Sequence, residues 1–194
     1  MDPSPSHKPG FFERLSLKLL GEPEDREQLL HLLHSAYEKN LMDADVLTII
    51  EGALASSETR VADVMIPRAQ MNAIDIDMPL AEILSRVVET AHSRFPVIDG
   101  DRDNVLGILL AKDLLRIQAA QEFDLRQWLH PAVFIPESKR LNVLLREFRV
   151  SRNHMAIVVN EYGGVAGLVT IEDVLEQIVG DIEDEYDFDE AHDN

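Results

Sequence analysis

The sequence of 194 residues contains no cysteine. Disulfide bonds, thiolate nucleophiles and zinc–thiolate sites are therefore excluded, and nothing indicates an oxidising compartment. Long apolar runs are missing too, since no segment approaches the roughly 20 apolar residues that a bilayer-spanning helix needs. The N-terminus also lacks the apolar core of a signal peptide. These absences predict a cytoplasmic protein.

Basic residues are scarce, with 18 Lys and Arg against 36 Asp and Glu, and the formal net charge is −18. Such a charge repels a phosphate backbone, so we expect no direct binding of nucleic acid. Eight of the acids lie in the last fourteen residues, and residues 183–194 are predicted to form a solvated acidic tail. A lone acidic run fixes no octahedral geometry for Mg²⁺, which disfavours a metal cage there.

Motifs of catalysis are missing as well. The sequence shows no nucleophile–base constellation, no P-loop and no Gly-rich dinucleotide turn, and Gly163–Gly164 is typical of a hairpin turn. We therefore predict that the chain is not an enzyme.

The N-terminal part is predicted to hold a flexible segment, 1–23, and a helical lead-in, 24–58. Residues 11–20 place three apolar side chains on one helical face, which leaves peripheral contact with the inner membrane as an alternative to local packing. The lead-in shows helical spacing twice and predicts a helical hairpin. Its first helix carries a pattern that offers a metal-binding alternative, although exposed helices produce such patterns by chance: Glu27, His31, His34 and Glu38.

From residue 61 onward the chain repeats itself. Residues 93–115 align with residues 153–175 without a gap, and residues 61–67 align with 125–131. Matching positions include Val105, Gly107, Asp113 and Leu115 with Val165, Gly167, Asp173 and Leu175. Two copies of one unit, 60–120 and 125–182, account for these matches.

Each copy shows the same order of predicted elements. A short strand (72–76 or 133–135) precedes an amphipathic helix from residue 80 or 141. Two strands joined by a turn follow (95–99 and 105–110, or 155–159 and 165–170), and then a closing helix that begins near Lys112 or Ile171. The predicted class is α/β (α+β), with β-α-β-β-α twice.

The closing helices are predicted to leave apolar faces exposed and so to form a homodimer. Their apolar residues are Leu114, Leu115 and Ile117 in the first copy, and Val174, Leu175 and Ile178 in the second.

This order, with FPVI before the first hairpin and GLVTIED after the second, resembles the CBS domain, which occurs in pseudo-twofold pairs called Bateman modules. The segments RVADVMIPRAQM (60–71) and HMAIVVNEYGGVAGLVTIEDVLEQIVGDIEDEYD (154–187) are similar to the CorC group of magnesium and cobalt efflux proteins. Members of that group generally add a small C-terminal domain. The resemblance therefore implies that this chain is the regulatory part alone.

The segment GLVTIEDVL (167–175) has two compatible interpretations. The spacing of Thr170 and Asp173 is that of a capping box at a helix start. The resemblance implies an adenosine-nucleotide site in the cleft, where Asp173 accepts from the ribose diol and Thr170 reaches ribose or phosphate.

The same resemblance implies further residues for this site. Val64, Ile66, Pro67, Met155 and Ile157 are expected to line it, all but Val64 as walls for the adenine. Arg68 and His154 are expected to bind phosphate, with the alternative that Arg68 is a surface residue paired with local acids.

A mirror-related second site is expected to be weaker, because Leu110 replaces the threonine. Its candidate residues are Arg94, Pro96, Lys112 and Asp113, and we expect it to be degenerate or empty. Any Mg²⁺ is expected to arrive on nucleotide phosphates.

The resemblance thus implies a regulatory module for magnesium and cobalt homeostasis that binds ATP or AMP and acts with a membrane ion transporter. The alternative is a dimerisation scaffold that docks a partner protein without binding nucleotide.

Overall fold

A computed structural model describes residues 23–117 and 124–180, and the chain divides into two compact units between Glu51 and Gly52. The predicted flexible segment 1–23, apart from its last residue, and the acidic tail 183–194 lie outside the described residues. Within the described part, no helix has the length and apolar character needed to span a membrane.

The lead-in forms the predicted helices α2 (Arg26–Glu38) and α3 (Ala44–Ala55). Asp25 caps α2 by accepting a hydrogen bond from the backbone N–H of Gln28 at 2.8 Å. His34 lies 2.6 Å from a carboxylate oxygen of Glu51. No cluster of three or more potential metal ligands exists among the residues with described positions, so the metal-binding alternative for α2 gains no support.

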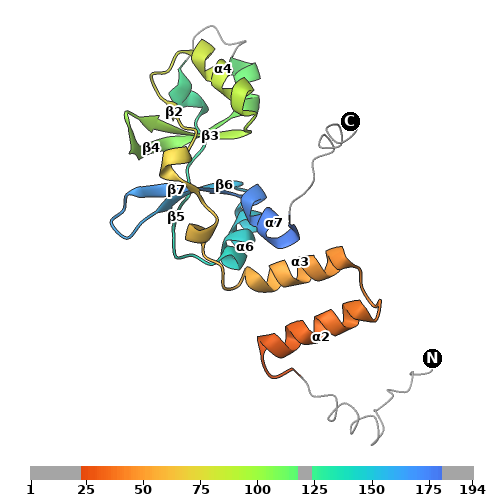
Figure 1. Cartoon of the computed structure of the whole chain (residues 1–194). Coiled ribbons are helices and arrows are strands. Elements are labelled where there is room, and N and C mark those ends of the chain that lie inside the picture. Colours follow the sequence, from red (N-terminus) through yellow and green to blue (C-terminus); the bar gives the residue numbers. More distant parts are fainter. Residues whose placement is uncertain (1–22, 118–123, 181–194) are drawn as a thin grey trace, which may run out of the picture. The chain divides into compact units, whose positions relative to one another are not determined.

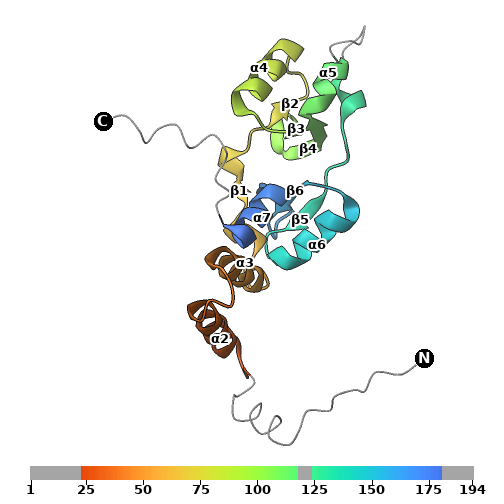
Figure 2. The same ribbon diagram turned by 90° about the vertical axis from the view of Figure 1, so that its right-hand side faces the viewer.

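The second unit contains both repeats, each with one sheet (Figures 1 and 2). Its strands are β1 (Ile66–Pro67), β2 (Ile74–Asp75), β3 (Arg94–Asp99), β4 (Asp101–Leu110), β5 (Phe134–Pro136), β6 (Met155–Val159) and β7 (Val165–Thr170). Its α-helices are α4 (Leu80–Thr90), α5 (Leu114–Ile117), α6 (Leu141–Ser151) and α7 (Ile171–Val179). Short 3₁₀ helices are η1 (Val61–Asp63), η2 (Arg68–Gln70), η3 (Ala111–Asp113) and η4 (Leu125–Trp128).

The strand pairing confirms the predicted β-α-β-β-α order. One sheet has the order β2-β3-β4 and the other β1-β7-β6-β5. In each repeat the first strand runs parallel to the second (β2 with β3, β5 with β6), and the second and third form an antiparallel hairpin. Only β1, a strand of two residues, was absent from the prediction.

Both faces of each sheet are buried, because successive side chains of a strand point to opposite faces. In β7, Val169 packs on the helix side with Val174, whereas Leu168 packs on the other side with Ile157. In β4, Leu109 and Ile108 divide in the same way between two clusters. The cluster that contains Ile108, Ile157 and Leu168 therefore joins the two repeats.

Each repeat also reaches across to the sheet of the other. Strand β1 pairs antiparallel with β7, placing Ile66 opposite Leu168 and Pro67 opposite Gly167. A Cβ atom at Gly167 would lie 2.2 Å from the carbonyl oxygen of Ile66, so only glycine permits this approach. In the related position, His130 forms an isolated bridge with Ile108.

The closing helices differ from the prediction of apolar exposed faces. Leu114 and Ile117 are each only 2% exposed, and Val174 is fully buried. These residues form the cores between helix and sheet, because the helices pack directly on their own sheets. Leu115, at 76%, and Leu175, at 37%, are the members of the predicted set that stay exposed.

Candidate functional site

Two cavities lie between the repeats. The first, which we name the threonine cavity, has a volume of about 350 Å³ and is lined by residues that include Ile66, Arg94, Met155, Leu168, Thr170 and Asp173. The second, which we name the basic cavity, has a volume of about 470 Å³ and is lined by residues that include Arg94, Lys112, His130, Arg152, His154 and Met155. Both volumes fall within the range of small-molecule sites.

Thr170 and Asp173 stand at the start of α7, where the strand β7 ends at the cavity. The Asp173 Oδ2 atom accepts hydrogen bonds from the backbone N–H and the hydroxyl of Thr170, each at 2.7 Å. The Thr170 hydroxyl in turn accepts from the backbone N–H of Asp173 at 3.2 Å. The predicted capping box is therefore present.

The capping box leaves one carboxylate oxygen of Asp173 unused. All of the contacts of this side chain use Oδ2, and no described residue donates to Oδ1. Because a carboxylate oxygen has lone pairs for two donors, Oδ1 is available to paired hydroxyls of a ligand. Capping and ligand binding are thus compatible at Asp173.

Apolar side chains form the opposite wall of the threonine cavity. Ile66 is held there by the pairing of β1 with β7, and it packs with Met155 and Leu168 in the cluster between the repeats. Polar groups also line it: the Asn72 amide lies 3.0 Å from Nε2 of His92. Neither Asn72 nor His92 was predicted as a site residue, because no motif marks them.

The remaining residues predicted for this site do not line the threonine cavity. Val64 packs against the core of the second repeat, and Ile157 is fully buried behind Met155 and Leu168. Pro67 is exposed on β1. His154 lines the basic cavity instead.

Arg68 was expected to bind phosphate, and it lines neither of the two cavities. Its guanidinium forms hydrogen bonds with Asp103, with Asp101 at 3.0 Å and with the carbonyl oxygen of Val165 at 3.1 Å. The hydrogen bond from Arg68, with that from the Val165 backbone N–H at 2.7 Å, lowers the pKa of Asp103. Asp103 raises the pKa of Arg68 in turn. Arg68 thus forms an ion pair with acids of its own repeat, and its hydrogen bond to Val165 reaches the second repeat.

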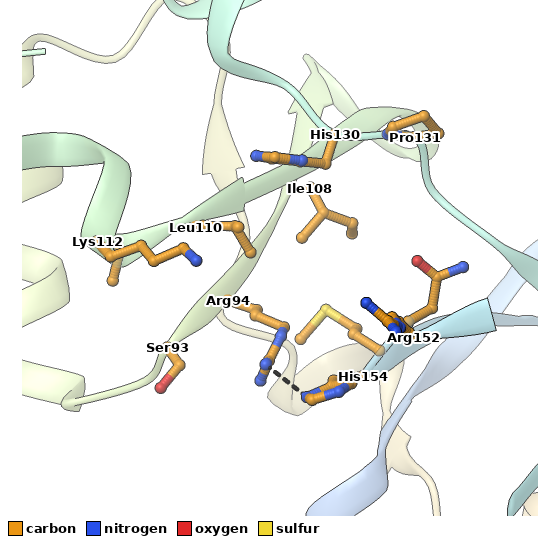
Figure 3. Close-up of a pocket in the computed structure, with 12 residues that line it drawn as sticks. Ser93, Arg94, Ile108, Leu110, Lys112, His130, Pro131, Arg152 and His154 are labelled. Carbon is orange, nitrogen blue, oxygen red and sulfur yellow. Dashed lines mark hydrogen bonds between the residues drawn. The ribbon is translucent and has the colours of Figure 1, made fainter. Parts of the chain in front are cut away.

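Arg94 separates the two cavities and lines both. Its Nη2 atom donates to Nδ1 of His154 at 2.8 Å (Figure 3). Its Nη1 atom lies 3.4 Å from Glu172. Since a guanidinium cannot accept, Nδ1 of His154 must accept, and the proton of the neutral ring sits on Nε2. His154 therefore offers one N–H donor, at Nε2.

The second predicted site is only partly assembled. Lys112 lines the basic cavity, as Arg94 does. Asp113, however, is 7% exposed, and its Oδ2 accepts from Nε2 of His130 at 2.9 Å, while Pro96 is buried in β3. Neither Asp113 nor Pro96 lines the threonine cavity or the basic cavity. Leu110 offers no hydroxyl that could hold Asp113 in a capping box.

Two basic residues of this cavity were missed by sequence reasoning: His130 and Arg152. In Figure 3, Lys112 and Arg152 approach the cavity from opposite sides, with His130 above and Arg94 and His154 below. The alignment of the repeats could have identified both residues, because each corresponds to a residue that lines the threonine cavity. His130 aligns with Ile66, and Arg152 follows α6 as Ala91 follows α4.

Comparison with known proteins supports the repeat and its cleft. Residues 61–120 and 129–180 match the CBS domain, and residues 21–55 match a family described as the N-terminal region of NMB0537. Over 191 residues the chain is 50% identical to the magnesium and cobalt efflux protein CorC of Vibrio cholerae serotype O1. This match covers 97% of the chain, which spans 65% of that relative's length.

Two solved structures carry the comparison further. The CBS domain of the bacterial CNNM/CorC family Mg²⁺ transporter is 39% identical with a TM-score of 0.74, covering 84% of this chain and 100% of that one. A structure of such a domain in complex with ATP is 42% identical with a TM-score of 0.63, covering 69% and 96%. Together with the two sheets and their pseudo-twofold cleft, these matches show that the chain carries a tandem pair of CBS domains and belongs to the CorC family.

Proposed function

We propose that this CBS pair is a regulatory module that binds an adenine nucleotide, ATP or AMP, in the threonine cavity. The observation that carries the proposal is the free Oδ1 of Asp173, held at the cavity by the capping box with Thr170. A related CBS domain has been solved with ATP, which supports the choice of nucleotide.

The cavity has the two kinds of surface that a nucleoside requires. Asp173 Oδ1 would accept from the ribose hydroxyls, and Ile66, Met155 and Leu168 would contact the adenine ring. Arg94 would contact the first phosphate, because its side chain is 23% exposed and lines the cavity. Mg²⁺ would arrive on the phosphates, since the described residues offer no ligand cluster of their own.

Ligand binding between the repeats suits a regulatory role. Thr170 and Asp173 belong to the second repeat, whereas Ile66 and Arg94 belong to the first. A nucleotide that contacts both repeats stabilises the relative arrangement of the repeats that binds it more tightly. The size of this shift is set by the difference in nucleotide affinity between that arrangement and the alternative one. In a CorC relative this shift would act on magnesium and cobalt homeostasis, through a membrane ion transporter and at the cytoplasmic side.

Titration calorimetry with adenosine, AMP and ATP, each with and without Mg²⁺, tests this proposal. Asp173→Asn keeps an acceptor for the cap but removes the charge. The affinity for adenosine should therefore fall by about 10- to 100-fold, the equivalent of losing hydrogen bonds to a charged group. Asp113→Asn is the matched control, because the related aspartate lines neither of the two cavities. Adenosine binding should survive that change.

Two results would contradict the proposal. No heat with any of the three ligands would favour the alternative of a dimerisation scaffold that docks a partner protein. Loss of adenosine binding in Asp113→Asn but not in Asp173→Asn would place the nucleoside site in the other half of the pair.

A further inference from the structure

The basic cavity differs in charge from the rest of the chain. Among the described residues, no Asp or Glu lines it, and five of the lining side chains are cationic or carry an imidazole: Arg94, Lys112, His130, Arg152 and His154. The formal net charge of the whole chain is −18, so this concentration of basic groups is opposite to the overall composition. Such a lining attracts an anion with several charges.

Part of this charge is already paired, and part is not. Arg94 lies 3.4 Å from Glu172, and His130 donates to Asp113 at 2.9 Å. By contrast, neither Lys112 nor Arg152 has a hydrogen-bond or ion-pair partner within residues 23–117 and 124–180, and the Nε2–H of His154 has none there either. The free donors come from both repeats and face one space (Figure 3).

The backbone at Arg152 supports the interpretation of a ligand site. Arg152 adopts a left-handed conformation, with φ of 56°, after the last residue of α6. Glycine or asparagine is favoured at such a position, and a long basic side chain gains nothing there from the backbone. The related position in the first repeat, Ala91, has φ of 53° and no charge.

The basic cavity lacks the groups that recognise a ribose. Leu110 stands where the other repeat has Thr170, and the carboxylate of Asp113 faces His130 instead of the cavity. Hydrogen-bond donors are plentiful, whereas no carboxylate of the described part of the chain lines the cavity. The cavity is therefore suited to phosphate oxygens and not to the hydroxyls of a sugar.

We propose that the basic cavity is a separate polyphosphate site, which binds a chain of two or more phosphates through Lys112, Arg152 and His154. Its volume of about 470 Å³ accommodates such a chain. The chain is either a free polyphosphate or the tail of a nucleotide whose nucleoside lies in the threonine cavity, because Arg94 and Met155 line both spaces. The proposal does not depend on nucleoside binding.

The test is calorimetry with inorganic tripolyphosphate, without Mg²⁺, on two double variants of equal charge. Lys112→Gln with Arg152→Ala removes the free cations, and Ala91 shows that alanine accepts the backbone conformation. Arg146→Gln with Arg149→Ala removes two exposed cations of α6 that line neither cavity. We expect the first double variant to bind tripolyphosphate about tenfold more weakly, or weaker still. The second double variant should keep an affinity for tripolyphosphate within about twofold of that of the unmodified protein.

Titrations with AMP and ATP distinguish the two sources. If the first double variant binds ATP more weakly but AMP normally, the cavity holds the phosphate tail of a nucleotide. If it binds both nucleotides normally, the ligand is a free polyphosphate. Absence of tripolyphosphate binding, or equal loss in both double variants, would overturn the proposal. Adenosine binding reports on the nucleoside site alone, so failure there is distinguishable from failure here.

Discussion

Replacement of Gly167 by alanine tests whether close backbone contact holds β1 in place. The new Cβ atom would lie 2.2 Å from the carbonyl oxygen of Ile66, well inside the 3.4–4 Å of ordinary contact. Because both groups belong to the backbone, no rotamer relieves the overlap, and β1 must move away from β7. One or two backbone hydrogen bonds are then lost, at about 1 kcal/mol each.

Displacement of β1 also exposes Ile66, which packs in the cluster between the repeats. Partial loss of that burial costs about 1–2 kcal/mol, so the free energy of unfolding should fall by about 2–4 kcal/mol in total. Adenosine affinity should fall as well, because Ile66 lines the threonine cavity. Urea unfolding measures the first effect and calorimetry the second.

Gly163→Ala is the control. Gly163 has φ of 82°, but a Cβ atom there would meet nothing within 4 Å. Its cost is the left-handed conformation alone, about 1–2 kcal/mol, with no change in adenosine binding. If Gly167→Ala destabilises the protein no more than Gly163→Ala and binds adenosine normally, the argument for close contact fails.

Three further predictions concern charge, core and assembly. The pKa of Asp103 is lowered in the folded state, so its stabilising effect is present above the unfolded pKa and is lost as the pH falls through the folded pKa. Asp103→Asn should therefore lower the free energy of unfolding at pH 7 but change it little near pH 3. Equal losses at the two pH values in urea unfolding would contradict this. Leu144→Ala should lower the free energy of unfolding by about 2–5 kcal/mol, whereas Leu115→Ala, at an exposed position, should change it by less than about 0.5 kcal/mol; similar effects would refute the core assignment. We expect the protein to form a homodimer through the exposed Leu115 and Leu175. Replacing both leucines by aspartate should dissociate this dimer, as measured by sedimentation. An unmodified protein that is monomeric at tens of micromolar would refute the prediction.

The order of elements was predictable because each repeat carries the two periods of secondary structure. The short apolar runs of residues 155–159 and 165–170, joined by a turn-rich segment, predict β6 and β7 at their observed bounds. Strand β1 was not predictable, since two residues show no period and its partner lies far along the chain. Leu114 and Val174 were misassigned as exposed because a helix packed on a sheet and a helix facing a partner have the same apolar stripe.

In the site, too, features that depend on residues close in sequence were predictable, whereas features that depend on residues far apart in sequence were not. The pair Thr170 and Asp173 was predictable, because a capping box depends on residues three apart. The position of Arg68 was not, because its partners Asp101 and Asp103 lie more than thirty residues along the chain, in β4, and both bind its guanidinium. The charge of the basic cavity arises from four separate segments, which only the fold brings together.

The crossing of β1 onto β7 has a consequence for folding. Ile66 and Leu168 pair over a sequence separation of roughly one hundred residues, a non-local contact that closes late in folding. The edge of the second sheet is therefore completed only when β1, from the start of the first repeat, pairs with β7. A second repeat produced alone would carry an open strand edge prone to aggregation, and the pair should unfold in one cooperative transition.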